Sequence, residues 1–475
     1  MSETSTSVND DADAAGAHGR TRLNFDLDVD VCVVGAGLAG LTVALCAARQ
    51  GASVAVLEGR QVGWNASGHM IGTVMPGFDL PLPDLIERVG LAHARALWAL
   101  SWSGAEFIRA QATAAMPGIG LSEGALEVSN VDAGDALIRR LQMLHEDFDT
   151  EVEGWQVERV RTELKTDRYF HGVHYPKAFQ LDGRRYVHAL ARLAHRAGAR
   201  IFEDTPVVSI DASGVRKRIV TPSARMRASH IVLAGNIHLG APLQKLSDTL
   251  LPVWRYGGVT APLGERLADA IAFRGSVSDT DGIDHFRVVD GDRLMWASPE
   301  TTWDAQPSGF AAALQRRIRT VFPQLGRVEI AETFGGVTGQ TVHGMPQIGQ
   351  LRKGLWVASG FGRQGLNTSA MAGQLIAQAI LAGDDRWKLF SPFELVWAGG
   401  VSGRVAGHVV NLWIRGRAAA AGTLARHRER VRAQERVREI RAAEAQRRAA
   451  ERPGSRLPLR PQPSDLNRRP DAGEG

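Results

Sequence analysis

One βαβ unit near the start of the chain constrains its fold more than any other feature. The apolar run Val31–Val34 predicts a short buried strand, and Leu38–Arg49 has the apolar period of a helix that ends at Gly51. The run Ser53–Leu57 predicts a second strand directly afterwards. A strand, a helix and a strand in this order indicate a parallel α/β sheet whose first turn can bind a ligand.

That first turn carries Gly35, Gly37 and Gly40 in the spacing G-x-G-x-x-G. The first glycine permits the tight turn, the second lets the backbone approach a pyrophosphate, and the third lets helix and strand pack closely. Glu58 follows the second strand, where a carboxylate accepts hydrogen bonds from an adenosine ribose. The sequence therefore predicts a dinucleotide site, with a purely structural glycine turn as the alternative. We expect contacts from Gly35, Gly37, Leu38, Ala39, Gly40, Glu58, Gly59 and Arg60.

Length and cysteine content place the chain in a broad class. Its 475 residues are too many for one ordinary core and suggest two domains with extensions. The two cysteines, Cys32 and Cys46, lie inside the βαβ unit and are typical of small buried apolar side chains. No disulfide framework or metal site is indicated, so a cytoplasmic location is expected. Residues 1–25 lack an apolar signal segment and predict a disordered leader.

The basic character of the chain belongs to its C-terminal tail. The net charge is +5, yet the segment from Arg404 to Gly475 has seventeen arginines against eight acids. Residues Ala418–Ala450 predict a solvated helix, and the proline-rich residues 451–475 predict a disordered end. Because no aromatic residues alternate with these arginines as stacking platforms, no specific nucleic-acid partner is expected.

Upstream of the tail, Leu395–Leu412 mixes tryptophan and valine with several glycines. It is too poor in large apolar residues to predict a membrane span. Two interpretations stay open: a helix packed on the body of the protein, and weak peripheral attachment to the inner face of an anionic membrane.

Two further glycine-rich segments predict the other end of the dinucleotide site. The segment Gly63–Gly72 is dominated by small residues, as required where a chain lies flat against a planar ring. Far downstream, Gly354–Asn367 reads as strand and glycine turn, followed by the helical run Thr368–Leu381. The start of this second helix can stabilise the negative charge of a reduced flavin, which a nicotinamide does not need.

With these motifs together, the chain resembles the D-amino acid oxidase superfamily of FAD-dependent amine oxidoreductases, in its glycine oxidase or γ-glutamylputrescine oxidase branch. The resemblance covers roughly Asp30–Gly383 and includes the segments Phe179–Leu190, Gly198–Val207, Ile231–Asn236 and Thr341–Gly349. It implies an α/β FAD-binding Rossmann-like domain and an α+β substrate domain with a mostly antiparallel sheet. It also implies further cofactor contacts from Ala66, Ser67, Gly68, Val207, Ala234, Gly360, Gly362, Gly365 and Leu366.

Comparison with the family pattern names three candidate catalytic residues, of which one is a match and two are departures. Arg363 matches an arginine that grips the substrate carboxylate in glycine oxidase-like relatives, and a guanidinium can do so at two points. His69 stands where many relatives have arginine, and His343 stands where they have aspartate. A structural role is the alternative for each of the three.

The resemblance implies oxidation of a C–N bond. A primary or secondary amine or an amino acid would pass a hydride to flavin N5, and the resulting imine would hydrolyse in water. Oxygen, a quinone or another carrier would accept the electrons. Because no cysteine follows Cys46, the cysteine link of some relatives is excluded and non-covalent FAD is expected. No metal site is expected.

The same resemblance divides the chain. Residues 26–84, 166–250 and 335–385 are expected to form the FAD-binding domain, and 85–165 with 251–334 the substrate domain. Helices are expected at Leu91–Ala115 and Asp135–His145, antiparallel strands within Leu251–Glu300, and a helical extension at 386–450. Trp254, Tyr256, Phe286 and Arg287 are candidates for the pocket wall or for sheet packing. Two other functions stay open: a non-catalytic flavin-fold scaffold and an NAD-linked dehydrogenase.

Overall fold

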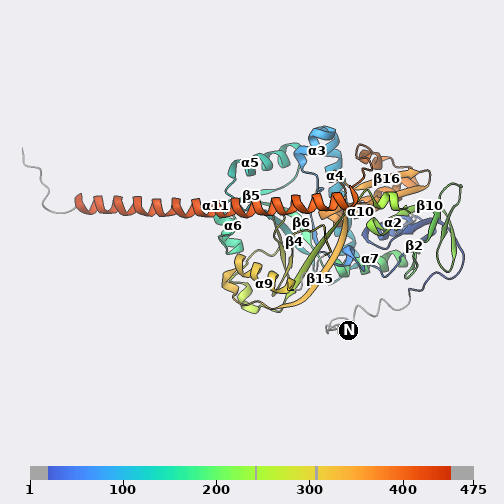
Figure 1. The fold of residues 1–475 in the computed structure, drawn as a ribbon, viewed down its shortest axis with the longest axis horizontal. Coiled ribbons are helices and arrows are strands. Elements are labelled where there is room, and N and C mark those ends of the chain that lie inside the picture. The colour runs from blue at the N-terminus through green and yellow to red at the C-terminus, as the bar shows by residue number, and fades with distance from the viewer. Residues whose placement is uncertain (1–19, 241–242, 305–308, 451–475) are drawn as a thin grey trace, which may run out of the picture. The chain divides into compact units, whose positions relative to one another are not determined.

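The computed structural model describes residues 20–240, 243–304 and 309–450, with side chains described as far as residue 447. The chain divides into two compact units, one ending at Gly422 and the other beginning at Thr423. The first unit contains two β-sheets, here called sheet A and sheet B, with helices packed on them (Figure 1).

Sheet A has eight strands among the described residues, in the order β16, β17, β10, β1, β2, β7, with β9 and β8 attached beside β10. The four pairings from β17 to β7 are parallel, so the carboxyl ends of these five strands meet at one edge. A parallel sheet places its ligand-binding loops at that edge. The strand bounds are β1 Leu27–Val34, β2 Val54–Leu57, β7 Arg200–Phe202, β8 Ser209–Asp211, β9 Lys217–Val220, β10 Arg225–Leu233, β16 Gln347–Arg352 and β17 Leu355–Ser359.

Both faces of sheet A are buried. In β1, Val31 and Val33 join the core that lies under α2 (Leu38–Arg49), while Cys32 joins a second core on the opposite face. Alternate residues of a strand point to opposite faces, and a strand buried on both faces reads as a continuous apolar run. Helix α2 has the bounds predicted for it, Leu38–Arg49.

Three further helices complete the layer on the α2 side of sheet A. They are α4 (Leu91–Ala115), α7 (Gly183–Arg196) and α10 (Gly365–Ala382). Helix α10 packs against both α2 and α4, and α7 packs against α2 (Figure 1). The prediction for α4 is confirmed, whereas α10 begins three residues before the predicted Thr368.

Sheet B has nine strands among the described residues, in the order β15, β11, β14, β13, β12, β4, β6, β3, with β5 beside β6. The antiparallel strands predicted within Leu251–Glu300 are confirmed, and the one parallel pairing joins β12 to β4. The strand bounds are β3 Thr73–Val74, β4 Ser122–Val128, β5 Glu153–Trp155, β6 Gly172–Gln180, β11 Leu251–Thr260, β12 Ser276–Asp279, β13 His285–Val289, β14 Arg293–Ala297 and β15 Ile330–Gln340.

One face of sheet B carries its own core. Phe286 stacks on Trp296 with ring centroids 4.3 Å apart, and Phe322 meets both rings edge-on. Offset-stacked and edge-to-face aromatic pairs add about 0.5–1.5 kcal/mol beyond their buried area. The helices near this core are α6 (Val157–Leu164) and α9 (Phe310–Val321). The remaining short helices are α3 Leu82–Val89, α5 Gly134–Gln142 and α8 Gln244–Ser247.

Sheet membership differs from the predicted domain ranges in three places. Strands β3 and β6 lie in ranges expected for the FAD-binding domain, and β15 crosses the boundary at residue 335, yet all three belong to sheet B. Strand pairing is a long-range contact, so the local pattern did not show which sheet would receive these strands. The domain ranges themselves stay a prediction.

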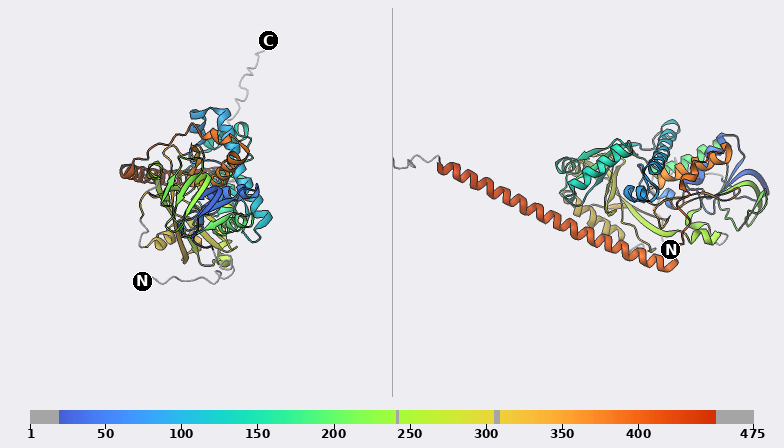
Figure 2. Two further views of the ribbon diagram at one scale, coloured as in Figure 1. Left: turned by 90° about the vertical axis from the view of Figure 1, so that its right-hand side faces the viewer. Right: turned by 90° about the horizontal axis from the view of Figure 1, so that it is seen from above.

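The C-terminal helix lies within the predicted helical extension at 386–450. Helix α11 runs from Gly400 to Ala450, so the helix predicted within Leu395–Leu412 and the one predicted at Ala418–Ala450 form one continuous helix (Figure 2). Glycine lowers helix propensity, but Gly407 here lets the helix approach the body: a Cβ would lie 3.1 Å from Cδ2 of Leu251. Among the described residues, no helix is long and apolar enough to span a membrane.

The predicted disordered leader is wrong for its last residues. Leu23 is fully buried, its N–H donates to Oγ1 of Thr205 at 3.1 Å, and Arg20 pairs with Glu203 at 3.1 Å. The Leu23 side chain packs in the core beside sheet A, and this packing orders the segment although the residues around Leu23 in the sequence are polar. Residues 1–19, and the tail predicted at 451–475, lie outside the described residues.

We expect Leu23→Ala to lower the free energy of unfolding by about 2–5 kcal/mol, because it removes a buried side chain and leaves a cavity. Urea unfolding followed by circular dichroism measures the change. The matched control is Val215→Ala in an exposed turn, which should alter the free energy by less than about 0.5 kcal/mol. Equal midpoints for the two variants would show that the segment does not stabilise the fold.

Candidate functional site

The glycines of the first turn are packed too tightly for side chains. Gly35 has φ +108°, and a Cβ there would lie 2.8 Å from the carbonyl oxygen of Ala234. A Cβ on Gly40 would overlap the carbonyl oxygen of Gly35 and lie 3.0 Å from Cγ1 of Val33. Only glycine accepts such a backbone and such an approach. The predicted roles of Gly35 as turn residue and Gly40 as packing residue therefore agree with the geometry.

The N-terminus of α2 is not capped by the side chain of its own N-cap residue. Its N-cap residue is Gly37, and its first turn contains no acidic residue. The N–H of Leu38 donates to Oγ of Ser67 at 3.2 Å. Because first-turn N–H groups, which include that of Ala39, lack intrahelical partners and the helix dipole is positive there, this end suits a phosphate.

Glu58 stands at the end of β2 and is held by two backbone amides. Its Oε2 accepts from the N–H of Ala36 at 2.8 Å, and its Oε1 accepts from the N–H of Arg60 at 2.9 Å. Burial raises the pKa of Glu58, and the two amides oppose that effect. The N–H of Thr205 donates to the Glu58 carbonyl oxygen, and half-buried Val207 follows two residues later. The predicted adenosine-side residues are thus neighbours in the fold.

The segment Ala66–Gly68 forms a short 3-10 turn that touches sheet B. The side chain of Asn65 donates to the carbonyl oxygen of Val337 at 2.9 Å and accepts from its N–H at 3.0 Å. A Cβ on Gly336 would lie 3.0 Å from Cα of Ala66. The small residues predicted beside a planar ring therefore lie where the two sheets meet.

The second helix start resembles the first. Helix α10 follows Gly360 and Gly362, both of which have positive φ, and Gly365 is its first residue. It has no side-chain cap and no acidic residue in its first turn. Its buried residue Leu366 belongs to the same turn. A second positively polarised helix end therefore points at the junction of the sheets.

A cavity of about 740 Å³ connects these features. Its wall includes Leu38 at the start of α2, Ala66 and Ser67 in the 3-10 turn, and Gly362–Leu366 at the start of α10. Strands of sheet B contribute Val253, Arg255, Asp279 and His285 to the wall, and Glu300 comes from the segment after β14. The volume lies in the usual range for a small-molecule or cofactor site.

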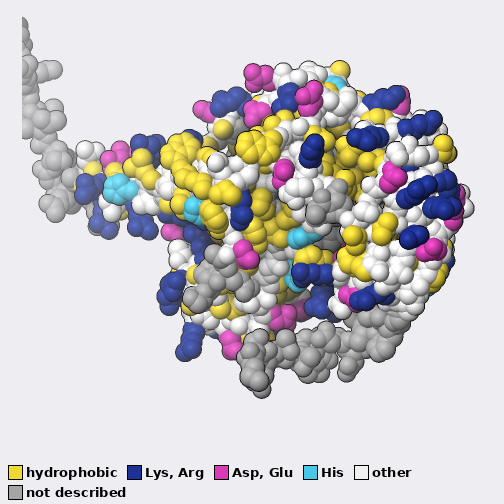
Figure 3. All heavy atoms as spheres, turned by 45° about the vertical axis from the view of Figure 1, so that its right-hand side comes forward, with side chains coloured by type: hydrophobic (Ala, Val, Ile, Leu, Met, Phe, Trp, Pro, Cys, Tyr) yellow, Lys and Arg dark blue, Asp and Glu magenta, His cyan; other side chains and the backbone are white. Residues whose placement is uncertain are grey.

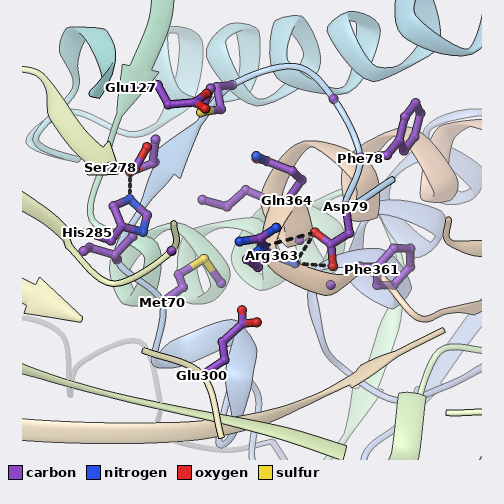
Figure 4. A pocket seen from close by; sticks show the side chains of 18 of the residues that line it. Met70, Phe78, Asp79, Glu127, Ser278, His285, Glu300, Phe361, Arg363 and Gln364 are labelled. Atoms are coloured by element: carbon purple, nitrogen blue, oxygen red, sulfur yellow. Dashed lines mark hydrogen bonds and ion pairs between the residues drawn. The ribbon is translucent and has the colours of Figure 1, made fainter. Parts of the chain in front are cut away.

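Arg363 and Asp79 form the central charged pair of this cavity (Figure 4). Asp79 accepts from the backbone N–H of Arg363 at 2.9 Å, and its Oδ1 lies 3.8 Å from Nε of the guanidinium. Burial raises the pKa of Asp79, while the charge of Arg363 lowers it. Glu300 is the main cause that raises the pKa of Arg363, so the guanidinium stays charged. Figure 4 shows Arg363 between Glu127 and Glu300.

Comparison with known families decides the identity of the site. The family model described as "FAD dependent oxidoreductase" (DAO) matches residues 30–379. The chain belongs to this family. It is therefore an FAD-dependent oxidoreductase, and both the scaffold and the NAD-linked dehydrogenase are set aside.

Relatives with known names agree with the family. The probable oxidoreductase OrdL of Haemophilus influenzae is 28% identical over 372 residues, which span 77% of this chain and 85% of the relative. The gamma-glutamylputrescine oxidoreductase of Escherichia coli is 25% identical over 364 residues, or 76% of this chain and 85% of the relative. The crystal structure of glycine oxidase from Geobacillus kaustophilus shares the fold: TM-score 0.64, 23% identity, 78% of this chain and 98% of that one.

The residues of this FAD-dependent oxidoreductase fit its cofactor. A dinucleotide needs an anion site for its diphosphate, and the uncapped start of α2 beside Gly37 provides one. The cavity continues from Leu38 to the uncapped start of α10, which leaves space for a flat ring beside Ala66–Gly68. Glycine positions whose Cβ atoms would overlap the backbone line this path.

The structure separates the two candidate histidines. His69 lines the cavity, and its Nδ1 donates to the carbonyl oxygen of Asn65 at 3.0 Å. His343 is not part of the cavity wall. Its Nδ1 accepts from the N–H of Met345 at 3.2 Å, and its Nε2 donates to the carbonyl oxygen of Glu394 at 3.2 Å. These two contacts favour the structural alternative for His343, and its catalytic role stays a prediction.

The four aromatic and basic candidates for the pocket wall belong to packing instead. In β11, Val253 and Arg255 line the cavity, so the alternate residues Trp254 and Tyr256 point to the other face. Phe286 stacks in the core of sheet B, and Arg287 is buried beside Gly72 outside the cavity wall. The register of each strand determines which side chains face the cavity, and the sequence did not show that register.

Sequence reasoning missed most of the polar cavity wall. Asp79 lies in the loop after β3, Gln340 ends β15, and Glu300 follows β14. Gln340 donates from Nε2 to Asp79 at 3.0 Å and to Glu300 at 3.4 Å, and Glu300 pairs with Arg255 at 3.0 Å. No motif connects these residues. The one local signal was the alternation of side-chain direction along β11, which could have identified Arg255 as a residue of the cavity wall.

We expect Gly40→Ala to weaken FAD binding at least about tenfold, because the new Cβ overlaps the Gly35 carbonyl and displaces the start of α2. Titration of the apoprotein with FAD, followed by flavin fluorescence, measures the affinity. Gly134→Ala is the matched control, since its Cβ meets only ordinary contacts at 3.6 Å or more. Wild-type affinity in a folded Gly40→Ala protein would contradict the role of this turn.

The cavity-lining Asp279 should make stability depend on pH. Burial, together with the charge of Asp284, raises the pKa of Asp279 from 3.8 to about 6. The folded state then holds a proton that the unfolded state has lost, so stability should fall by about 2 kcal/mol from pH 4 to pH 6 and level off above about pH 7. Urea unfolding across this range should show the slope in the wild type and a smaller slope in Asp279→Asn.

Proposed function

We propose that this chain oxidises the C–N bond of a primary or secondary amine, or of an amino acid, to an imine that hydrolyses in water. The observation that carries the proposal is the single cavity, which joins the starts of α2 and α10 to the charged pair of Arg363 and Asp79. Two kinds of relative are named for nitrogen-bearing compounds, gamma-glutamylputrescine and glycine.

The proposal divides the work between the two sheets. Sheet A and its helices would hold the cofactor through Gly35, Gly37 and Glu58, while sheet B would cover the substrate. The dipole of α10 would stabilise negative charge on the reduced ring, because its first-turn N–H groups have no capping side chain. Bound FAD supplies a hydride acceptor at N5, with oxygen or a carrier such as a quinone as final electron acceptor.

Arg363 is the proposed substrate anchor. Asp79 accepts from its backbone N–H and touches the guanidinium only at 3.8 Å, so the side chain keeps donors for a carboxylate. His69 would line the substrate side, fixed by Asn65. The apolar residues Met70 and Phe361 in the same wall would keep water away from the reacting carbon (Figure 4).

We also propose that FAD is bound without a covalent link. The sequence has no cysteine after Cys46, and burial raises the pKa of Cys46 to about 11, which keeps its thiol protonated. A ring nitrogen of His69 is already engaged with backbone. His285, the other histidine named in the cavity wall, has its Nε2 2.9 Å from Oγ1 of Thr73.

We expect a panel of glycine, D-alanine, sarcosine, proline and putrescine to contain at least one compound that bleaches the flavin absorbance of the purified protein under anaerobic conditions. Admission of oxygen, and separately of a soluble quinone, then shows which acceptor restores the colour. A protein that retains FAD and is bleached by dithionite but by no amine would contradict the proposal.

Arg363→Lys tests the anchor within the same assay. We expect it to raise KM for a carboxylate-bearing substrate roughly tenfold or more, since lysine loses the two-point contact, and to leave KM for a simple amine nearly unchanged. Arg139→Lys, at an exposed position of the same cavity wall, is the matched control. Equal KM values for Arg363→Lys and wild type would remove Arg363 from substrate binding.

A further inference from the structure

A row of apolar side chains on the first turns of α11 and just before it is exposed. It consists of Trp397, Val401, Val405, Val409, Leu412 and Trp413, and we call it the apolar stripe. Trp397 is 67% exposed, Val401 69% and Trp413 61%. Figure 3 shows hydrophobic side chains gathered over the start of this helix. From Val401 on, their spacing places them on one helix face, and an exposed apolar face of this kind marks an interaction surface.

The opposite face of the same turns is fixed to the body of the first unit. The Arg404 guanidinium lies over the rings of Trp303 and Trp254, at 4.9 and 5.3 Å from their centroids. The Arg404 carbonyl oxygen accepts from Oγ1 of Thr302 at 2.9 Å, and Ala418 is buried. The apolar stripe therefore cannot turn inward without breaking these contacts.

The charge around the apolar stripe has one sign. No acidic residue occurs between Leu395 and Arg428, a segment that contains five arginines. Arg417 lies over the Trp413 ring, 5.3 Å from its centroid. The sequence from Thr423 to Ala450 then has nine arginines against four glutamates. A helix that lies in the headgroup region of an anionic bilayer typically has tryptophan and valine on one face and arginine next to them. The segment from Leu395 to Arg428 has this composition.

We infer that the apolar stripe binds the surface of an anionic lipid bilayer, with the first turns of α11 lying in the membrane plane. The tryptophans would enter the headgroup boundary and the arginines would contact lipid phosphates. A second copy of the helix fits less well, because Ala418–Ala421 interrupt the apolar pattern and pairing would bring arginines of like charge together. This inference goes beyond the proposed oxidation and does not depend on it.

The test is co-sedimentation of the full-length protein with phosphatidylcholine vesicles, with and without phosphatidylglycerol. We expect binding only to the vesicles with phosphatidylglycerol, and we expect it to weaken as salt increases. Val409→Gln with Trp413→Gln should reduce the partition coefficient roughly tenfold or more. Arg428→Gln with Arg430→Gln should reduce it roughly fivefold for each arginine.

Val215→Gln, which replaces an even more exposed valine in the turn between β8 and β9, is the matched control and should bind as the wild type does. Flavin absorbance and circular dichroism of each variant show that the body is folded. Equal binding to both vesicle types, or unchanged binding of the Val409→Gln with Trp413→Gln variant, would overturn the inference. A dimer without lipid that this variant abolishes would also overturn it, because a second copy would then cover the apolar stripe.

Discussion

The close approach of three backbone segments at the carboxyl end of β1 is the constraint on which the structure depends. The turn at Gly35 lies against Ala234 after β10, and Gly40 of α2 lies against the turn itself. A single methyl group at either glycine would separate strand from helix. Because this contact is met, α2 begins at the sheet edge, and its N-cap residue Gly37 has no side chain to cap the helix. The same contact sets the direction in which α2 crosses sheet A.

Two polar contacts hold sheet B over this edge. Asn65 pairs through its amide with both backbone groups of Val337, and Asp79 accepts from the backbone N–H of Arg363. Each joins segments that are far apart in sequence, and each is paired in a partly buried place, where an unpaired polar group would cost stability. The cavity is the space that these contacts leave between the sheets, so they position the cofactor side relative to the substrate side.

Several charges in the cavity wall are paired with a neighbour of opposite sign. Glu300 pairs with Arg255, and Glu127 pairs with Arg140 through two hydrogen bonds. Arg363 has Asp79 at a longer distance than these pairs have. Pairing lowers the cost of burying each ion, and of these three arginines Arg363 is the one least tightly held by a carboxylate.

The sequence by itself determined the first βαβ unit, both glycine turns and the flavin-binding family, because each depends on residues that are neighbours along the chain. It also gave the bounds of α2 and α4. Strand register decided the rest: Arg255 faces the cavity while Trp254 and Tyr256 face away, and His343 bonds to backbone outside it. Burial of Leu23 came from contacts with distant segments. Such contacts pair residues hundreds of positions apart, so only the tertiary structure could assign Asp79 and Glu300 to the site.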